Sequence, residues 1–305
     1  MNTVDKVVAV LGATGQQGGA VAEALSRDGW RVRAVTRSPR GEAAKRLAAA
    51  GAEVVSADLD DRASLDAAFA GAWGVYSVHP GTFDGSEYAD DRRHEVRGGV
   101  NVVDAALRAG AGHLVYSSSV GVGAPELESV LPLIANKAEV ERHIRDSGIS
   151  ATILRPVSFM QNYLGSHRGL RDGALVTPLS PDMNEPLIAT EDIGAFAALA
   201  FADPDRHRGQ AYELAGDSLV QPEIAAAIGR AAGGRVPYVQ VPLDEIRKAS
   251  PDTARALETM NKFMPQVDIE RLRAIHPGLL TFDAWLRRHR DEVRAKVAER
   301  SAAAS

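Results

Sequence analysis

The stretch that decides the fold is VLGATGQQGGAV, residues 10–21. Three glycines, Gly12, Gly15 and Gly18, are spaced three residues apart and follow an apolar run that begins at Val7. In a dinucleotide-binding loop the first glycine turns the chain off the strand, the second lets the backbone approach a pyrophosphate, and the third allows the helix to pack closely. A strand–helix turn without a ligand is the alternative, so the flanking segments have to decide.

The segments on both sides of this loop alternate between strand and helix patterns. Continuous apolar or β-branched runs predict buried parallel strands, and amphipathic segments between them predict helices. The predicted strands are 6–11, 31–36, 53–57, 73–78, 113–117 and 150–154, and the predicted helices are 16–28, 42–50, 62–69, 88–109 and 134–147. Short connections between such units imply a parallel sheet covered on both faces. We therefore predict an α/β fold with a Rossmann-type, doubly wound parallel sheet.

This regular alternation ends at Pro156. Further along the chain, helical patterns occur at 192–201, 222–232, 243–248, 252–263, 268–274 and 281–298, and short strand patterns at 210–214 and 236–241. We expect a nucleotide-binding Rossmann domain over residues 1–155 and a smaller, mostly helical substrate or cap region over residues 156–305. The segment 210–214 is short enough to return to the main sheet.

Composition excludes several classes of function. The chain of 305 residues has a net charge of −5, and a nucleic-acid partner would favour a basic surface. It has no cysteine, which excludes disulfides and thiolate metal sites, and its eight histidines show no HExxH spacing, so we expect no metal. There is no signal-like start and no apolar run of about 18 residues, so we expect a cytoplasmic protein without a membrane partner.

The end of the second predicted strand indicates which dinucleotide is bound. NAD-binding proteins usually place an acidic residue there, which holds the ribose 2′-hydroxyl. This sequence has Thr36, Arg37 and Ser38 instead, with Arg40 nearby. Because a guanidinium presents a planar fork of donors to a phosphate, NADPH is favoured over NADH. The alternative is that these arginines are ordinary solvated surface residues.

Other candidate cofactor contacts surround the loop. The start of the helix after the loop offers free N–H groups and a partial positive charge to an anion. Asp58 could accept a hydrogen bond from the adenine amino group while Leu59 packs on the ring, although Asp58 could equally cap the following helix. The remaining candidates are Thr14, Gln16, Gln17 and Val78.

Four motifs together resemble the NmrA-like branch of the short-chain dehydrogenase/reductase superfamily. They are GATGQQGG, TR, ADLDD and LRPVSFMQNYL, which follow the first, second, third and sixth predicted strands; LTFDAWLRRHRDE also resembles the C-terminal helix of NADPH-sensing members. The resemblance covers nearly the whole chain. It implies a Rossmann-like fold, an NADP(H) ligand and a small C-terminal region that lines a cleft. Some members of this branch reduce quinones, dyes or phenylpropanoids, and others act as redox sensors.

The resemblance also implies where catalytic residues would lie. The superfamily commonly uses a serine, a tyrosine and a lysine, with the tyrosine four residues before the lysine. Here Leu133 takes the tyrosine position before Lys137, so the usual proton donor is missing. By resemblance Lys137 holds the nicotinamide ribose or is itself the acid/base; the alternative is an exposed lysine near a helix start. Ser119 aligns best with the superfamily's serine, although it could serve only as a loop hydrogen-bonding residue.

Two more groups of residues lie after strands that end near the expected nicotinamide site. His79 is a candidate substitute proton donor because a free histidine has a pKa of about 6.5, but a surface histidine would look the same. Pro156 and Phe159 should border the nicotinamide. Phe159, Met160 and Tyr163 could form an apolar wall for the substrate, and residues at such spacing also commonly belong to the core.

These observations lead to two functional hypotheses. The first is an NADPH-dependent oxidoreductase that transfers hydride to a small, apolar, conjugated acceptor such as a quinone, dye or enone. Such an activated acceptor needs little help from a proton donor, which fits the missing tyrosine. The second is a non-catalytic NADP(H)-binding redox sensor that acts through a protein partner. The sequence leaves the oligomeric state open.

Overall fold

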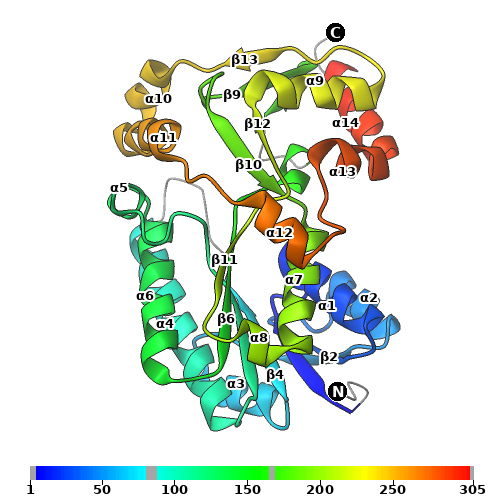
Figure 1. The fold of residues 1–305 in the computed structure, drawn as a ribbon, viewed down its shortest axis with the longest axis vertical. Helices are drawn as coiled ribbons and strands as arrows, with labels where there is room; N and C mark the ends of the chain where they lie inside the picture. The colour runs from blue at the N-terminus through cyan, green and yellow to red at the C-terminus, as the bar shows by residue number, and fades with distance from the viewer. Residues whose placement is uncertain (1–4, 80–87, 165–168, 303–305) are drawn as a thin grey trace. The chain divides into compact units, whose positions relative to one another are not determined.

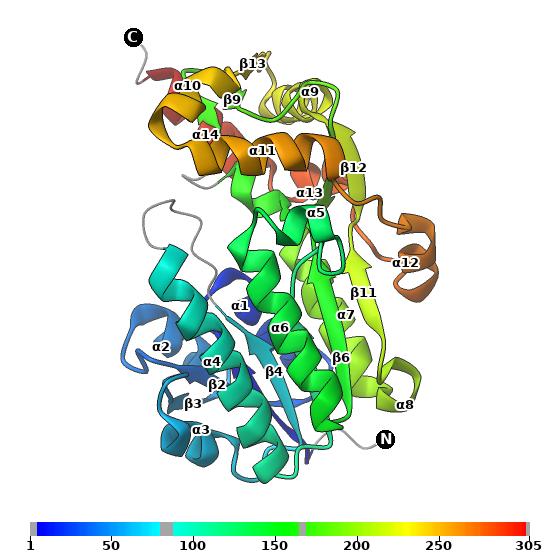
Figure 2. The same ribbon diagram turned by 90° about the vertical axis from the view of Figure 1, so that its left-hand side faces the viewer.

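The computed structural model describes residues 5–79, 88–164 and 169–302 (Figures 1 and 2). The chain divides into two compact units, and it passes between them several times. Unit 1 comprises residues 1–123, 132–155 and 193–213, and unit 2 comprises residues 124–131, 156–192 and 214–305. No helix of the described ranges is long and apolar enough to cross a membrane.

A seven-stranded sheet forms the centre of unit 1. Its strand order is β11-β6-β5-β4-β1-β2-β3. The strands are β1 (Val7–Leu11), β2 (Arg31–Thr36), β3 (Glu53–Ser56), β4 (Gly74–Val78), β5 (His113–Ser117), β6 (Ala151–Pro156) and β11 (Ala211–Leu214). The six strands from β1 to β6 pair in parallel, and the order reverses at β1. In open α/β sheets, ligands bind beyond the carboxyl ends of the strands at such a reversal. The predicted Rossmann-type fold is confirmed.

Helices cover both faces of this sheet (Figures 1 and 2). They are α1 (Gln16–Arg27), α2 (Glu42–Ala49), α3 (Arg62–Phe69), α4 (Tyr88–Arg108), α6 (Pro132–Ser147), α7 (Thr190–Ala202) and α8 (Pro204–His207). Helices α3, α4 and α6 pack side by side on one face. On the other face α7 packs closely on α1, since a Cβ on Gly194 would lie 2.5 Å from the carbonyl oxygen of Ala20. The buried strands β1 and β5 explain the continuous apolar runs in the sequence.

Unit 2 is richer in strands than the sequence patterns indicate. Its helices are α5 (Pro125–Glu128), α9 (Gln221–Ala232), α10 (Leu243–Ala249), α11 (Pro251–Phe263), α12 (Ile269–Ile275), α13 (Phe282–Arg288) and α14 (Arg290–Ala302), with a 3-10 turn, η1 (Met160–Tyr163). Two three-stranded sheets accompany these helices. One is β12-β10-β7, formed by Asp217–Val220, Asn184–Ile188 and Ser158–Phe159; the other is β13-β9-β8, formed by Tyr238–Gln240, Ala174–Thr177 and Leu170–Arg171. The predicted helical region is confirmed, but five of these six strands lie where no strand was predicted.

The predicted continuous helix 281–298 is wrong in one respect. The chain forms two helices, because α13 ends at Arg288 and α14 begins at Arg290. His289 caps α13 with a backbone ψ of 22°, and its side chain lies 3.1 Å from Glu191. A single helical pattern in the sequence cannot reveal such a tertiary contact.

The burial of His113 predicts that unit 1 loses stability in acid. The His113 side chain is fully buried, and its ring nitrogens lie 2.9 Å from the hydroxyls of Ser150 and Thr152. Burial, followed by the charge of His207, lowers the pKa of His113 from 6.5 to about 4. Because the unfolded chain then binds more protons below pH 6.5, this contribution to stability is present above pH 6.5 and is lost as the pH falls toward 4.

We expect His113 alone to lower the free energy of unfolding by about 2 kcal/mol between pH 7 and pH 5. Urea unfolding of the wild type and of His113→Gln at both pH values measures this, since glutamine keeps a hydrogen-bonding group but does not titrate. The variant should lose clearly less stability than the wild type on acidification. Equal losses in the two proteins would refute the assignment of the effect to His113.

Candidate nucleotide and active site

The glycine loop has a conformation that only glycine supports. Gly12 has a φ of +63°, and a Cβ there would lie 2.8 Å from Cγ1 of Val78, the last residue of β4. A Cβ on Gly18 would lie 2.2 Å from the carbonyl oxygen of Gly12. Gly15 closes the turn by donating its N–H to that same oxygen over 2.8 Å. The loop is therefore compact and has no side chains at these positions that would keep a ligand from the backbone.

The start of α1 fits an anionic ligand. Gly15 is the N-cap residue, no side chain caps the helix, and its first turn has no acidic residue. Thr14 and Gln16 are exposed there. Gln17 is instead half-buried and accepts a hydrogen bond of 2.6 Å from the hydroxyl of Ser117. Open N–H groups and the partial positive charge of a helix start are the features that bind a pyrophosphate.

The end of β2 presents a free cation. Arg37 is exposed and makes no salt bridge or hydrogen bond with any residue in the described part of the chain. Arg33, on the same strand, is fixed instead by the carboxylate of Glu53 at 2.9 Å. Thr36 is buried and its hydroxyl accepts the N–H of Ser38 over 3.1 Å, so it shapes the turn that carries Arg37. Arg37, Ser38 and the nearby Arg40 are exposed.

The two candidates after β3 have different surroundings. Asp58 is exposed and accepts the N–H of Asp60 over 2.9 Å, whereas the N-cap of α3 is Asp61. Asp58 is therefore not the helix cap. Leu59 is half-buried, and its carbonyl accepts a 2.9 Å hydrogen bond from the side chain of Asn101 on α4. The predicted adenine contacts of Asp58 and Leu59 stay predictions.

Lys137 lies in a buried ion pair. Its side chain is 7% exposed, and its ammonium nitrogen lies 2.8 Å from Oε1 of Glu95, whose side chain is 4% exposed. The pair is close, but its geometry is not that of a hydrogen bond. Asn136 donates to the other oxygen of Glu95 over 3.4 Å. The alternative that Lys137 is an exposed lysine is therefore excluded.

The histidine at the end of β4 does not have an ordinary pKa. His79 is 3% exposed, and its Nε2 lies 3.0 Å from the hydroxyl of Ser77. Burial, followed by the charge of Lys137, lowers the pKa of His79 to about 3. The prediction of His79 as a proton donor assumed a pKa near 6.5, whereas burial lowers the pKa to about 3. The alternative of a surface histidine is excluded because the ring is buried, and the proton-donor role stays a prediction.

A buried tyrosine next to Lys137 was not predicted. The ring of Tyr116 on β5 lies 5.7 Å from the ammonium nitrogen of Lys137. Burial, followed by the charges of Glu95 and Glu141, raises the pKa of Tyr116 well above its usual value. Its hydroxyl is sealed from solvent and has no hydrogen-bond partner in the described ranges. Tyr116 is therefore a poor substitute for the superfamily's proton-donating tyrosine, whose position Leu133 occupies.

The three serines at the end of β5, Ser117, Ser118 and Ser119, differ in their partners. Ser117 donates to Gln17, and Ser118 donates to the buried carboxylate of Glu141 over 2.6 Å. Glu141 also receives two hydrogen bonds from Arg155, at 2.9 and 2.7 Å. Ser119 is half-buried, and its side chain makes no hydrogen bond to any residue whose position is described. Among the three, Ser119 is thus the hydroxyl that is available to a ligand.

The predicted substrate residues belong to unit 2. Met160 and Tyr163 are fully buried in its apolar cluster, and the hydroxyl of Tyr163 donates to Glu185 over 2.7 Å. Pro156, at the end of β6, is buried, whereas Phe159 is half-buried. Met160 and Tyr163 therefore present no surface to a ligand, which favours the core alternative for these two residues.

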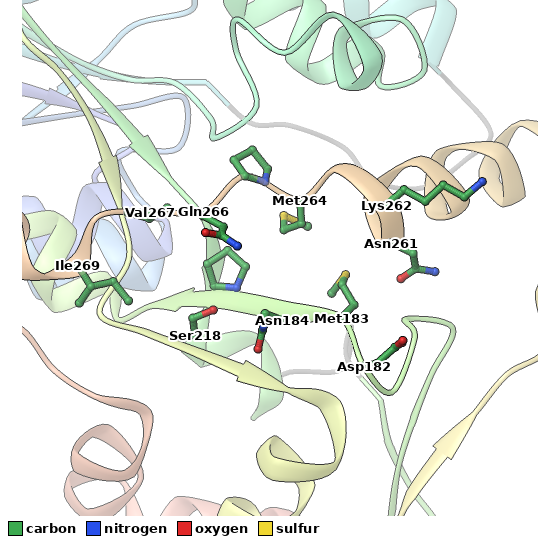
Figure 3. Close-up of a pocket in the computed structure, with 12 residues that line it drawn as sticks. Asp182, Met183, Asn184, Ser218, Asn261, Lys262, Met264, Gln266, Val267 and Ile269 are labelled. Atoms are coloured by element: carbon green, nitrogen blue, oxygen red, sulfur yellow. The ribbon is translucent and has the colours of Figure 1, made fainter.

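A cavity of 380 Å³ in unit 2 was not predicted (Figure 3). It lies between β10 and β12 on one side and the connection from α11 to α12 on the other. It is lined by Asp182, Met183, Asn184, Pro186, Ser218, Asn261, Lys262, Met264, Pro265, Gln266, Val267 and Ile269. Its volume is within the range of small-molecule sites. Among the described residues, no cluster of acidic or histidine side chains could hold a metal ion.

Sequence reasoning missed Glu95, although the sequence contains a signal for it. The buried stripe of α4 contains Gly98, Gly99, Val102, Val103 and Ala106, and Glu95 occupies the preceding position of the same stripe. An acidic residue on an apolar helical stripe indicates a buried charge that needs a partner. The partner, Lys137, comes from α6, so only the fold reveals the pair.

Comparison with known proteins identifies the family. A sequence model of the NmrA-like family matches residues 4–280. The chain is 32% identical over 244 residues to a (4-alkanoyl-5-oxo-2,5-dihydrofuran-3-yl)methyl phosphate reductase from Streptomyces griseus, and 30% identical over 245 residues to an NAD(P)H azoreductase from Xenophilus azovorans; each match covers 80% of both chains. The structure of an NADPH-dependent quinone oxidoreductase from Escherichia coli is similar, with 26% identity, a TM-score of 0.73, and coverage of 92% of this chain and 98% of that one. The chain therefore belongs to the NmrA-like family.

Proposed function

We propose that the protein is an NADPH-dependent oxidoreductase that reduces a small, conjugated acceptor. The observation that carries the proposal is the pairing of an uncapped, glycine-built helix start with the free guanidinium of Arg37 at the end of the neighbouring strand. The first element suits a pyrophosphate and the second suits a 2′-phosphate. When bound, NADPH would supply a hydride.

The residues of unit 1 divide the binding of the cofactor among them. The backbone at Gly12, Gly15 and the start of α1 would bind the pyrophosphate, and Arg37 would bind the 2′-phosphate. Ser119 is the accessible candidate for the nicotinamide ribose, and Lys137, which the resemblance assigns to the same role, would have to expose its buried ammonium nitrogen to join it. Because an acidic residue is absent from the end of β2, a bare 2′-hydroxyl would find no carboxylate to accept its hydrogen bond there.

The names of the relatives support a conjugated acceptor. The azoreductase, the quinone oxidoreductase and the reductase of a 5-oxo-2,5-dihydrofuran share an electron-poor π-bond as the reducible group. Reduction at such a bond gives an anion that is stabilised by conjugation. Burial keeps the His79 ring uncharged and raises the pKa of Tyr116, so neither side chain readily supplies a proton at pH 7. Such a site is suited to this chemistry, because the product anion can take its proton from water.

The test is NADPH oxidation by the purified protein, followed at 340 nm with a panel of quinones, azo dyes and enones. We expect turnover with at least one acceptor. Lys137→Met, made together with Glu95→Gln so that no buried carboxylate is left without a cation, should lower kcat/KM about tenfold relative to Glu95→Gln alone, which corresponds to the loss of one hydrogen bond from a charged group. Lys45→Met, at an exposed lysine of α2, is the control and should have no effect.

A second outcome would favour the alternative function. If no acceptor is reduced while NADPH still binds and changes the affinity for a protein partner or the oligomeric state, the protein is a redox sensor. Leu133 at the tyrosine position is the observation that favours this alternative. Failure to bind NADPH would contradict both functions.

A further inference from the structure

The cavity of unit 2 is formed by two parts of the chain that are far apart in the sequence. Four residues of the segment 182–186, together with Ser218, come from β10, the turn before it and β12 (Figure 3). The others, within 261–269, come from the end of α11, the connection after it and the start of α12. None of these lining residues is a candidate for cofactor or substrate binding, so the cavity is a further place where a ligand could bind.

The apolar part of the lining suits an aromatic ring. Met183, from the sheet side, and Met264, from the connection after α11, both pack in the same small hydrophobic cluster. A thioether sulfur attracts the edge of an aromatic ring, and the unbranched methionine side chain adapts to the shape of the ring. Two methionines from opposite walls therefore favour an aromatic ring over an aliphatic chain. The other apolar lining residues are Pro186, Pro265, Val267 and Ile269.

Asn261 supplies a hydrogen-bond donor with a defined orientation. This residue is half-buried, and its side-chain oxygen accepts the backbone N–H of Ser180 over 3.0 Å. Because this bond determines which end of the amide is the oxygen, the other end is the NH₂ group with its two donors. The nitrogen makes no hydrogen bond within the described ranges. A ligand in the cavity would meet this donor with an acceptor such as a carbonyl oxygen.

The charged residues of the lining balance each other. Lys262 is exposed and forms no ion pair with any residue whose position is described, and Asp182 is exposed as well. One positive and one negative charge leave the lining without a net charge, and solvent screens both of them. A charged ligand would therefore gain little over a neutral one. Further neutral hydrogen-bonding groups come from Asn184, Ser218 and Gln266.

We propose that the cavity binds a small, neutral aromatic compound with a carbonyl oxygen. The ring lies between Met183 and Met264, and the oxygen accepts a hydrogen bond from the side-chain nitrogen of Asn261. This proposal does not rest on the proposed function, because the residues of the candidate nucleotide site belong to unit 1 and those of the cavity belong to unit 2. Each proposal can therefore fail without the other.

The test is NMR of the full-length, nucleotide-free protein with carbon-13 in its methionine methyl groups, titrated with coumarin, which is a neutral aromatic lactone. The chain has five methionines, and Met183→Leu and Met264→Leu assign the two signals of the cavity. We expect both signals to shift with one saturable Kd below about 1 mM, because the ring current of the probe acts on adjacent methyl groups. Met160, which is fully buried in the other apolar cluster of unit 2, is the internal reference. Signals of Met183 and Met264 that stay in place, or move without saturation, would overturn the proposal.

Two variants test the place and the hydrogen bond. Ser218→Trp introduces an indole at the cavity from the edge strand β12, where Ser218 is exposed, and should abolish the shift of the methionine signals. Ser218→Ala is the control and should keep the Kd within about threefold. Asn261→Asp keeps an oxygen for the N–H of Ser180 but replaces the donor by a second acceptor, so it should raise the Kd at least about tenfold. Wild-type affinity in folded Ser218→Trp or folded Asn261→Asp would contradict the proposed binding mode.

Two related probes test the chemical class of the ligand. The compound δ-valerolactone has the carbonyl group without the aromatic ring, and its Kd should be at least about tenfold higher than that of coumarin. Coumarin-3-carboxylate adds a negative charge to the same ring system and should bind no more tightly than coumarin. Equal binding of δ-valerolactone would exclude the aromatic preference, and tighter binding of the carboxylate would show that the site selects an anion.

Discussion

Substitution of Arg37 by alanine is expected to raise the Kd for NADPH about 30-fold and to change the Kd for NADH less than twofold. A charge-assisted hydrogen bond of a guanidinium to a phosphate contributes about 2 kcal/mol, which corresponds to this factor. NADH has no 2′-phosphate, so it has nothing to lose when the guanidinium is removed. Arg37 is exposed and has no partner in the described part of the chain, so its removal should leave the fold intact.

The control for this prediction is Arg31→Ala. Arg31 is also exposed and lies on the same strand, at its opposite end. The Arg31→Ala substitution removes the same charge from the protein, but Arg31 lies away from the glycine loop. The Kd of this variant for NADPH should therefore match that of the wild type. Fluorescence titration of NADPH and NADH into the three proteins provides the data. If Arg37→Ala raised the Kd values for NADPH and NADH by the same factor, Arg37 would not recognise the 2′-phosphate.

Gly18→Ala is expected to weaken the binding of NADPH and of NADH alike, with each Kd raised at least 100-fold. A Cβ at this position would lie 2.2 Å from the carbonyl oxygen of Gly12 and 2.8 Å from the backbone nitrogen of Ala13. Both neighbours are backbone atoms, so the loop can relieve the overlap only by moving away from α1. The predicted pyrophosphate site consists of this loop and the start of α1, and the movement would separate them.

Gly19→Ala is a closely matched control for this effect. The next glycine of the same helix would place its Cβ 3.4 Å from the nearest atom, the carbonyl oxygen of Ala13, which is an ordinary contact. Alanine in a helix interior is also favoured over glycine by about 1 kcal/mol. Gly19→Ala should therefore bind both cofactors like the wild type and melt at the same or a higher temperature. Wild-type affinity in Gly18→Ala would mean that the loop does not form the site.

The centre of the main sheet could be predicted from sequence because strands such as β1 and β5 are fully buried. Burial on both faces favours continuous apolar runs, and the chain shows them at Val7–Leu11 and, within β5, at Leu114–Tyr116. The glycine loop could be predicted for a similar reason, since the positive φ of Gly12 and the close contact at Gly18 allow no other residue. In both segments a strong physical constraint, burial or backbone geometry, restricts which residues the sequence can have.

The strands of the two small sheets in unit 2 have much weaker sequence patterns. Strands β7 and β8 have two residues each, which is too short for a hydrophobic period to show. The outcome for Met160 and Tyr163 has a related cause. Apolar residues that wall a ligand site and those that fill a core have the same spacing, and only burial in the fold distinguishes them.

The buried charges of the site could be predicted only in part. Lys137 was found because a motif marks it, whereas Glu95 lies 42 residues earlier on another helix and Tyr116 lies on a strand between them. The pKa of His79 also depends on tertiary burial, which the sequence does not show. Properties that arise from several elements at once, such as charge pairing and desolvation, follow from the fold and not from any one segment.

The most direct test of this account is isothermal titration calorimetry of the wild-type protein with NADPH and with NADH. The account predicts one site per chain and a Kd for NADPH at least tenfold lower than that for NADH. Tighter binding of NADH, or no measurable heat with either nucleotide, would contradict it.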